Sequence, residues 1–266
     1  GEGVQTTMQK MGLSMLKRGH IFSSHMHGDH VFGLPGLIST MGLLGRTAQL
    51  HIHAPQEMED FLNCILKMFC EGMEYEVLFH AIDTKQHYII YEDRSVEVWS
   101  LPLHHRVPCA GFLFKEKQAL PHIRREMIDA FNIPVSQINN IKAGASWTTE
   151  DGTFIPHERL TTPAEPARSY AYCSDTRYNP RLAEMIQGVD LLYHEATFPH
   201  EMLTQAQKTM HSTSIEAAMM AKSAGAAKLL IGHYSARIKN ESPLLEEAKS
   251  VFPNTILAQE GIKIRI

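Results

Sequence analysis

The stretch His25-Met26-His27-Gly28-Asp29-His30 decides how the rest of the sequence is interpreted, because it places three imidazoles and one carboxylate within six residues. An apolar run at 20–24 precedes it, and a segment of small and apolar residues at 31–44 follows it. We therefore expect it to form a loop between a strand and a helix. Neutral imidazoles and carboxylates are the ligands that suit zinc and similar divalent ions, so the stretch predicts a metal site.

The spacing within this stretch allows more than one ion. His25 and His27 are two residues apart, so their rings point the same way in an extended segment. Asp29 and His30 follow at an offset that suits a second ion. The alternative is a histidine-rich surface tract, but such a tract has no fixed aspartate and is not framed by a strand and a helix. We therefore favour the metal site.

The composition is that of an ordinary globular protein. Of 266 residues, 44% are hydrophobic and 20% are charged, which is enough for one large domain with a sizeable core. A net charge of −4 argues against indiscriminate nucleic-acid binding but permits a local basic patch. The four cysteines form no C-x-x-C pair and predict reduced thiols in a cytoplasmic protein. No apolar run reaches membrane-spanning length, so we expect no membrane partner.

The hydrophobic pattern predicts alternating strands and helices, which indicates an α/β protein built on a sheet. We expect helices at 5–16, 31–44, 55–69, 121–131, 214–224 and 243–252. We expect strands at 20–24, 50–53, 76–82, 87–91, 95–101, 169–173, 189–193, 227–232 and 262–266. His51 and His53 alternate with apolar residues, and we interpret them as hydrogen-bonded or solvent-facing strand side chains.

Further side chains that bind metal well come directly after predicted strands. They are a histidine pair (His104 and His105), Asp175 and His233. An aspartate at the end of a strand can bridge two cations through its two oxygens, and a helix N-cap is the weaker alternative for Asp175. Ligands at one set of strand ends imply a site on one edge of the sheet.

Three motifs carry a resemblance to a known family. The H-x-H-x-D-H string at 25–30 is the signature of the metallo-β-lactamase superfamily, and the segment GHIFSSHMHGDHVFGLPGLISTMGLLGR at 19–46 resembles the ribonuclease Z family within it. H-E-A-T at 194–197 and H-S-T at 211–213 resemble that family too. In that family a further histidine is followed by five residues, a glycine and an aromatic residue. This spacing favours His105 over His104. The resemblance implies a single αββα sandwich domain over 1–266.

The resemblance also implies the roles of the site residues. Two zinc ions per chain are implied, with Asp175 shared between them. One ion would take His25, His27, His105 and Asp175, and the other would take Asp29, His30, Asp175 and His233. Asp29 would also orient or deprotonate the attacking water. His211 would give a proton to the departing oxygen while Glu195 holds its ring, although a packing role at a helix start is the alternative for His211.

The function that the resemblance implies is endonucleolytic removal of the 3′ trailer from precursor tRNA, which leaves a 3′-hydroxyl. The family is commonly a homodimer, so precursor tRNA and a second copy of the chain are the expected partners. Two alternatives stay open: a phosphodiesterase or other small-molecule hydrolase of the same fold, and a metal-containing RNA-binding module without turnover. Fold alone does not separate these functions, but the H-E-A-T and H-S-T strings favour the endoribonuclease.

The region 115–168 looks the least globular, and in ribonuclease Z this region forms an arm that grips tRNA. Basic residues outnumber acidic ones between 115 and 142, although a solvated surface helix would show the same balance. The Gly-Pro-rich tip of many family members is replaced by Ile-Pro-Val-Ser-Gln at 133–137, so the arm is expected to be short or differently shaped. We expect RNA contacts from Lys117, Arg124, Arg125, Lys142 and Arg237.

The chain opens with Gly1-Glu2-Gly3-Val4-Gln5, which resembles a turn that ribonuclease Z places after two N-terminal strands. Those strands are not in this sequence, so the sandwich would lack them and its first sheet would end in an unpaired edge. We therefore expect the protein in its natural form to be longer by on the order of 30–40 residues, two short strands and their turns.

Overall fold

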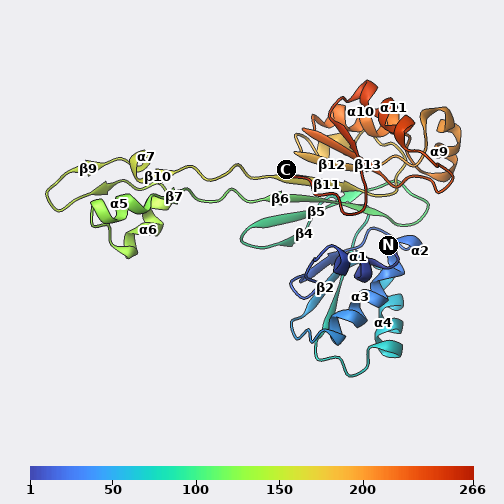
Figure 1. Ribbon diagram of the computed structural model, residues 1–266, viewed down its shortest axis with the longest axis horizontal. Coiled ribbons are helices and arrows are strands. Elements are labelled where there is room, and N and C mark those ends of the chain that lie inside the picture. Colours follow the sequence, from blue (N-terminus) through green and yellow to red (C-terminus); the bar gives the residue numbers. More distant parts are fainter. The chain divides into compact units, whose positions relative to one another are not determined.

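Most of the strands that precede candidate metal ligands in the sequence belong to one seven-stranded sheet. The computed structural model describes residues 1–266, and the strands follow the order β14-β13-β12-β11-β6-β5-β4 (Figure 1). From β11 to β14 all neighbours pair in parallel, so their carboxyl ends meet at one edge. The strands are β4 (Ile89–Glu92), β5 (Val96–Pro102), β6 (Ala110–Glu116), β11 (Ser169–Cys173), β12 (Leu191–Glu195), β13 (Lys228–Gly232) and β14 (Thr255–Leu257).

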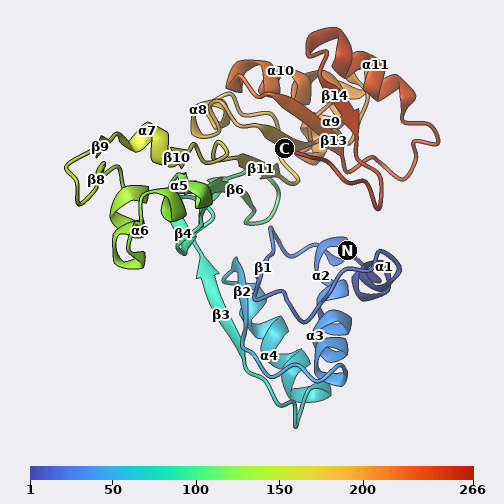
Figure 2. The same ribbon diagram turned by 60° about the vertical axis from the view of Figure 1, so that its left-hand side comes forward.

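A smaller sheet of three parallel strands comes from the first third of the chain. It consists of β1 (His20–Phe22), β2 (Leu50–Pro55) and β3 (Val77–Ile82). Figure 2 shows helices along one side of this sheet. Leu50 and Ile52 of β2 are fully buried and belong to the apolar core that the sheet forms with these helices. On the other side the Phe22 ring lies 5.5 Å from the rings of Phe112 and Phe114 in β6. The two sheets are thus the inner layers of a sandwich.

The helices that pack against the three-stranded sheet bury one apolar face. In α3 (Gly33–Leu43) the buried residues Leu34, Leu37, Ile38 and Met41 recur at the spacing of a single helix face. The other helices of this part of the chain are α1 (Val4–Lys10), α2 (Gly28–Val31) and α4 (Met58–Phe69). The histidine-rich stretch at 25–30 links β1 to α2, so its position is determined by the packing of these elements.

The seven-stranded sheet is covered by a second set of helices, among which α10 is packed most deeply. Its buried alanines, Ala217, Ala218 and Ala221, allow a close approach to the strands. A capping box between Thr213 and Glu216 begins this helix, and Gly225 with φ of 61° ends it. The helices are α8 (Leu182–Met185), η1 (His200–Met202), α9 (Leu203–Thr209), α10 (Ser214–Ala224) and α11 (Ser242–Val251).

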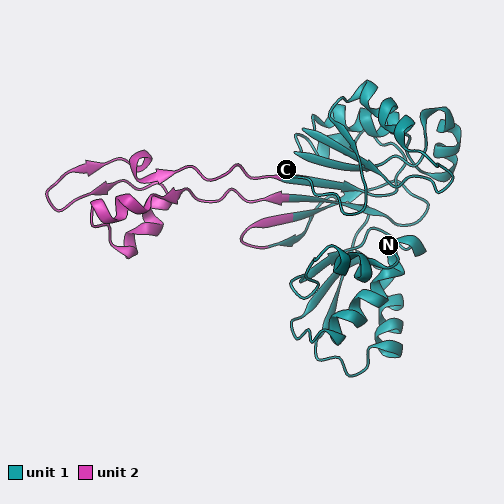
Figure 3. Cartoon of the chain, viewed as in Figure 1, with its two compact units in different colours: residues 1–92, 98–114, 169–266 teal, residues 93–97, 115–168 magenta.

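The chain separates into two compact units (Figure 3). The first comprises 1–92, 98–114 and 169–266, and the second comprises 93–97 and 115–168. The second unit has a small core of its own, made of Ile133, Ile141, Ile155 and Leu160. Its elements are β7 (His122–Ile123), α5 (Arg125–Ala130), α6 (Val135–Lys142), β8 (Trp147–Thr148), β9 (Phe154–Ile155), α7 (His157–Leu160) and β10 (Thr161–Thr162).

Several predicted elements differ from the structure. The strand expected at 262–266 is wrong, because its alternating isoleucines have no core to enter: Ile262 and Ile266 stay exposed, and β14 is the last strand. The helix expected at 121–131 is two residues of strand followed by α5. The helix expected at 5–16 ends at Lys10, just before Gly12 adopts φ of 67°. None of the helices is long and apolar enough to cross a membrane.

Candidate metal centre

The stretch at 25–30 connects a strand to a helix, as the sequence predicted. It leaves β1 in an extended conformation, and His27 is the N-cap of α2 with φ of −85° and ψ of 146°. A Cβ at Gly28 would lie 2.5 Å from a ring carbon of Phe32, so a larger residue here would require the exposed Phe32 ring to move. The turn into α2 places Asp29 and His30 in the first turn of the helix.

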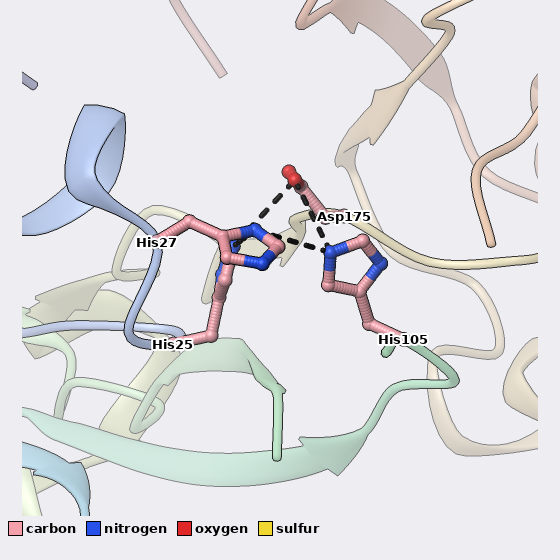
Figure 4. A group of neighbouring side chains, drawn as sticks. All are labelled: His25, His27, His105 and Asp175. Carbon is pink, nitrogen blue, oxygen red and sulfur yellow. Dashed lines mark hydrogen bonds and ion pairs between the residues drawn. The ribbon is translucent and has the colours of Figure 1, made fainter. Parts of the chain in front are cut away.

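Four side chains from three parts of the chain form the first donor group: His25, His27, His105 and Asp175. Figure 4 shows their imidazole rings gathered around the carboxylate. His25 Nε2 lies 3.0 Å from His27 Nδ1, and His105 Nε2 lies 3.3 Å from the same atom. Asp175 Oδ2 lies 3.5 Å from His25 Nε2 and 3.8 Å from His105 Nε2. One potential ligand atom from each residue thus points into a common space.

The second donor group consists of Asp29, His30 and His233, and it meets the first at Asp175. His233 Nε2 and His30 Nε2 lie 3.2 Å and 3.5 Å from Asp175 Oδ1. Asp29 Oδ2 lies 3.4 Å from His30 Nε2 and 3.8 Å from His233 Nε2. Each oxygen of Asp175 therefore faces a different group, which is the arrangement expected of a bridging carboxylate.

Neighbouring polar atoms orient the imidazole rings. His105 donates from Nδ1 to the carbonyl of Met210 at 3.0 Å, and His25 Nδ1 lies 3.0 Å from Ser24 Oγ. These bonds occupy the nitrogen that faces away from the donor group, which leaves Nε2 of each ring directed at it. Met210 and Ser24 had no predicted role, because nothing near them in the sequence marks their contacts with the site.

The electrostatics of the donors fit a divalent cation. Asp175 is only 2% exposed, and burial raises its pKa above the ordinary range of a carboxyl. Burial, followed by the neighbouring imidazoles, lowers the pKa of His25 to about 2, so the ring is neutral and one of its nitrogens has a free lone pair. Neutral imidazoles with a buried carboxylate are the donor chemistry of zinc and related ions. The residues present therefore fit the metal that the sequence suggested.

A carboxylate and an imidazole form a pair beside the donor groups. Glu195 is fully buried, and its Oε1 accepts hydrogen bonds from His211 Nδ1 and from the backbone N–H of Thr176, each at 2.8 Å. Burial alone would raise the pKa of Glu195, but these bonds hold it below its ordinary value. Burial alone would lower the pKa of His211, but the bond to Glu195 and its charge raise it. The pair therefore favours the protonated form of His211.

Thr197 connects this pair to the second donor group. The Thr197 hydroxyl donates to Glu195 Oε2 at 2.5 Å. The hydroxyl oxygen of Thr197 also lies 3.0 Å from His233 Nδ1. The two oxygens of Glu195 thus serve different partners: Oε1 holds His211, and Oε2 orients His233 through Thr197. No role for Thr197 was predicted, although it is the last residue of the H-E-A-T string.

The residues expected to contact RNA lie outside both donor groups. Lys117, Arg124, Arg125 and Lys142 belong to the second unit, whereas Arg237 is exposed and follows β13 in the first. Arg124 donates from Nε to the carbonyl of Thr161 at 3.2 Å, so it also supports the local fold. Their contribution to RNA binding stays a prediction.

Comparison with known proteins identifies the family. No family model matches the chain. A ribonuclease Z of Bacteroides fragilis (strain YCH46) is 52% identical over 266 residues, which are 100% of this chain and 88% of that protein. A ribonuclease Z of Porphyromonas gingivalis (strain W83) is also 52% identical, over 99% of this chain and 87% of its own length. The chain belongs to the ribonuclease Z family.

Solved structures agree with this assignment at the level of the fold. Human tRNase Z, short form, superposes with a TM-score of 0.68 at 22% identity, over 100% of this chain and 86% of its own. YhfI of Bacillus subtilis, a metallo-β-lactamase fold protein, superposes with a TM-score of 0.64 at 17% identity, over 98% and 83% of the two chains. The predicted metallo-β-lactamase fold is therefore confirmed for this member of the ribonuclease Z family.

Proposed function

We propose that this protein is a metal-dependent endoribonuclease that removes the 3′ trailer from precursor tRNA and leaves a 3′-hydroxyl on the tRNA. One observation carries the proposal beyond the family name. Asp175 directs one oxygen at each of two donor groups, and the Glu195–His211 pair lies beside them. A bridged pair of cation sites next to an imidazole held by a buried carboxylate suits hydrolysis of a phosphodiester.

We assign two zinc ions to the donor groups. His25, His27, His105 and Asp175 would hold one, and Asp29, His30, Asp175 and His233 would hold the other. When bound, two such ions supply Lewis acidity for the attack of water on phosphorus and for the charge that develops there.

Two side chains of the protein would accept and donate the protons of the reaction. The side chain of Asp29 is 69% exposed, so it can receive a proton from the attacking water. The departing 3′-oxygen would receive a proton from His211. Because Nδ1 of His211 is hydrogen-bonded to Glu195, its Nε2 remains for this transfer. The bond from phosphorus to that oxygen breaks as the proton arrives, and the trailer leaves with a 5′-phosphate.

The second unit is our candidate for the arm that grips tRNA. It folds around its own core and carries four of the five predicted RNA contacts, Lys117, Arg124, Arg125 and Lys142. We also propose that the protein acts as a homodimer in the cytoplasm, as the resemblance to its family suggested. Size-exclusion chromatography with light scattering tests the dimer.

Cleavage of a precursor tRNA, with mapping of both new ends, tests the proposed function. We expect cleavage at the start of the trailer, a 3′-hydroxyl on the tRNA and a much higher kcat/KM than for a chromogenic phosphodiester. Glu195→Gln should remove the activity, whereas Glu184→Gln, a change at an exposed glutamate on α8, should leave it intact. A preference for the small diester would replace this proposal with the small-molecule hydrolase.

A further inference from the structure

Four histidines form a layer on the three-stranded sheet, apart from the donor groups. They are His20 from β1, His51 and His53 from β2, and His80 from β3. The parallel register places His20 beside His51 and His53 beside His80. His51 and His53 are two residues apart on one strand, so all four side chains share one face of the sheet. We call them the histidine layer.

The rings of the histidine layer stack, and their nitrogens meet in pairs. Ring centroids lie 4.6 Å apart for His20 and His51 and 4.6 Å apart for His53 and His80. His51 Nδ1 lies 2.9 Å from His80 Nε2, and His20 Nδ1 lies 3.1 Å from His53 Nε2. Between two imidazoles such a contact is held by one proton, which a metal ion can replace.

Burial lowers the pKa of two members of the histidine layer, His53 and His80. Burial first, and then the adjacent imidazoles, lower the pKa of His53 to about 3, and burial and His51 lower that of His80. His53 is 3% exposed, and its Nδ1 has no hydrogen-bond partner. His80 by contrast is exposed and His51 half-buried, so the pair that they form is reachable from solvent.

We propose that His51 and His80 form a further metal site for a late divalent transition ion such as Zn²⁺. Two ligand nitrogens at about 2.0–2.1 Å from one ion lie about 2.9–3.4 Å apart, and the His51–His80 pair already has that separation. Imidazole is the ligand that zinc, copper and nickel share. Water completes the coordination, and the ion joins β2 to β3 at the solvent-facing part of the histidine layer.

Two protein ligands predict an exchangeable ion, held more weakly than ions in the two donor groups. Its binding requires the paired strands, so it stabilises the folded state only. The site uses no residue of the donor groups. It therefore stands or falls independently of the proposed ribonuclease activity.

Counting bound ions tests the site. Protein dialysed against increasing free Zn²⁺ is analysed by inductively coupled plasma mass spectrometry, as wild type, His51→Gln, His80→Gln and the control His122→Gln. His122 is exposed in β7, outside the histidine layer. We expect wild type and the control to bind about one ion per chain more than either of the other two variants. Equal counts in all four proteins would overturn the proposal, and a loss in His122→Gln as well would mean adventitious surface binding.

Two further measurements keep the result unambiguous. The same difference of about one ion should persist when all four proteins also carry Asp175→Ala, which removes the shared ligand of the donor groups. Because His80 is exposed, His80→Gln should fold, and its Tm without metal should match that of wild type. Added Zn²⁺ should then raise the Tm of Asp175→Ala more than that of the double variant, and identical shifts would also contradict the site.

Discussion

At the scale of single residues, Asp175 is the side chain on which the donor groups depend. Its two oxygens face His25 and His105 on one side and His30 and His233 on the other. Asp175→Ala should therefore lose both bound ions, whereas His233→Ala should weaken mainly one. Metal analysis of the purified variants measures this, with Asp129→Ala on exposed α5 as a control. If Asp175→Ala keeps both ions, the shared carboxylate is the wrong assignment.

Glu195 and His211 should behave as a unit in turnover. Because neither belongs to the assigned ligand sets, Glu195→Gln and His211→Ala should retain metal while kcat falls by roughly 10²–10⁴-fold, as expected for a lost general acid. The double variant should lose little more than either single variant, because the 2.8 Å bond makes one depend on the other. Single-turnover cleavage of precursor tRNA provides the rates. Fully multiplicative losses would show that the two residues act separately.

Residue types at predicted strand ends marked out the candidate donors, and the family resemblance was needed to choose His105 over His104, but neither marked the atoms that orient the rings. The H-x-H-x-D-H string, Asp175 and His233 could be found because each follows a predicted strand directly. Thr197 and Met210 act on His233 and His105, which lie 36 and 105 residues away in the chain. A single sequence contains no local signal for such contacts, since they exist only after the strands have aligned.

At the scale of elements, the second unit can be removed at a defined junction. Gln118 donates to the carbonyl of Glu165 at 3.2 Å, so the two connecting segments lie side by side there. Replacing 119–164 by a short Gly-Ser linker should raise KM for precursor tRNA and leave hydrolysis of a small phosphodiester unchanged. The salt dependence of tRNA binding should flatten as phosphate contacts are lost.

A milder variant controls for misfolding after this deletion. Arg125→Gln changes one exposed side chain and keeps the core of the second unit, so it should weaken tRNA binding without any loss of stability. Binding titrations at several salt concentrations and thermal unfolding measure both effects. Equal loss on both substrates after the deletion would instead give the second unit a role in supporting the fold.

Elements with local signals at both ends were the ones predicted best. The helix at 214–224 matches α10, because a capping box and a terminal glycine mark its limits, and the strand at 169–173 matches β11. The hydrophobic pattern predicted a strand wrongly at 262–266, where apolar residues alternate but are not buried. It also failed in the second unit, where α6 went unpredicted and a helix was expected across β7. Elements this short depend on their neighbours more than on their own propensities.

At the scale of the whole molecule, acid should destabilise the metal-free protein partly through His53. Burial and the adjacent imidazoles lower its pKa to about 3, whereas an unfolded histidine titrates near about 6.5. Between these values the unfolded chain binds a proton that the folded protein does not. The free energy of unfolding should therefore fall by up to about 1.4 kcal/mol for each pH unit below about 6.5 from this group.

Urea unfolding in the presence of a chelator measures this dependence. His53→Gln should show a shallower fall in the free energy of unfolding between about pH 6.5 and pH 4, because it removes one proton from the difference between the two states. His122→Gln, at an exposed position, should keep the wild-type slope. Parallel slopes for wild type and His53→Gln would mean that His53 titrates normally in the folded protein.

Met210 has a consequence for the tolerance of this chain to changes in length. It ends α9 with φ of 60°, a left-handed conformation that is strained for a side chain other than glycine. Its carbonyl receives the His105 hydrogen bond, and the next residue along the chain is His211. One inserted residue at this point would displace either the carbonyl that orients His105 or the ring of His211. Inserting one residue at the exposed turn of Asp151 and Gly152 moves no site residue, so precursor-tRNA cleavage should survive insertion there and disappear after insertion at Met210.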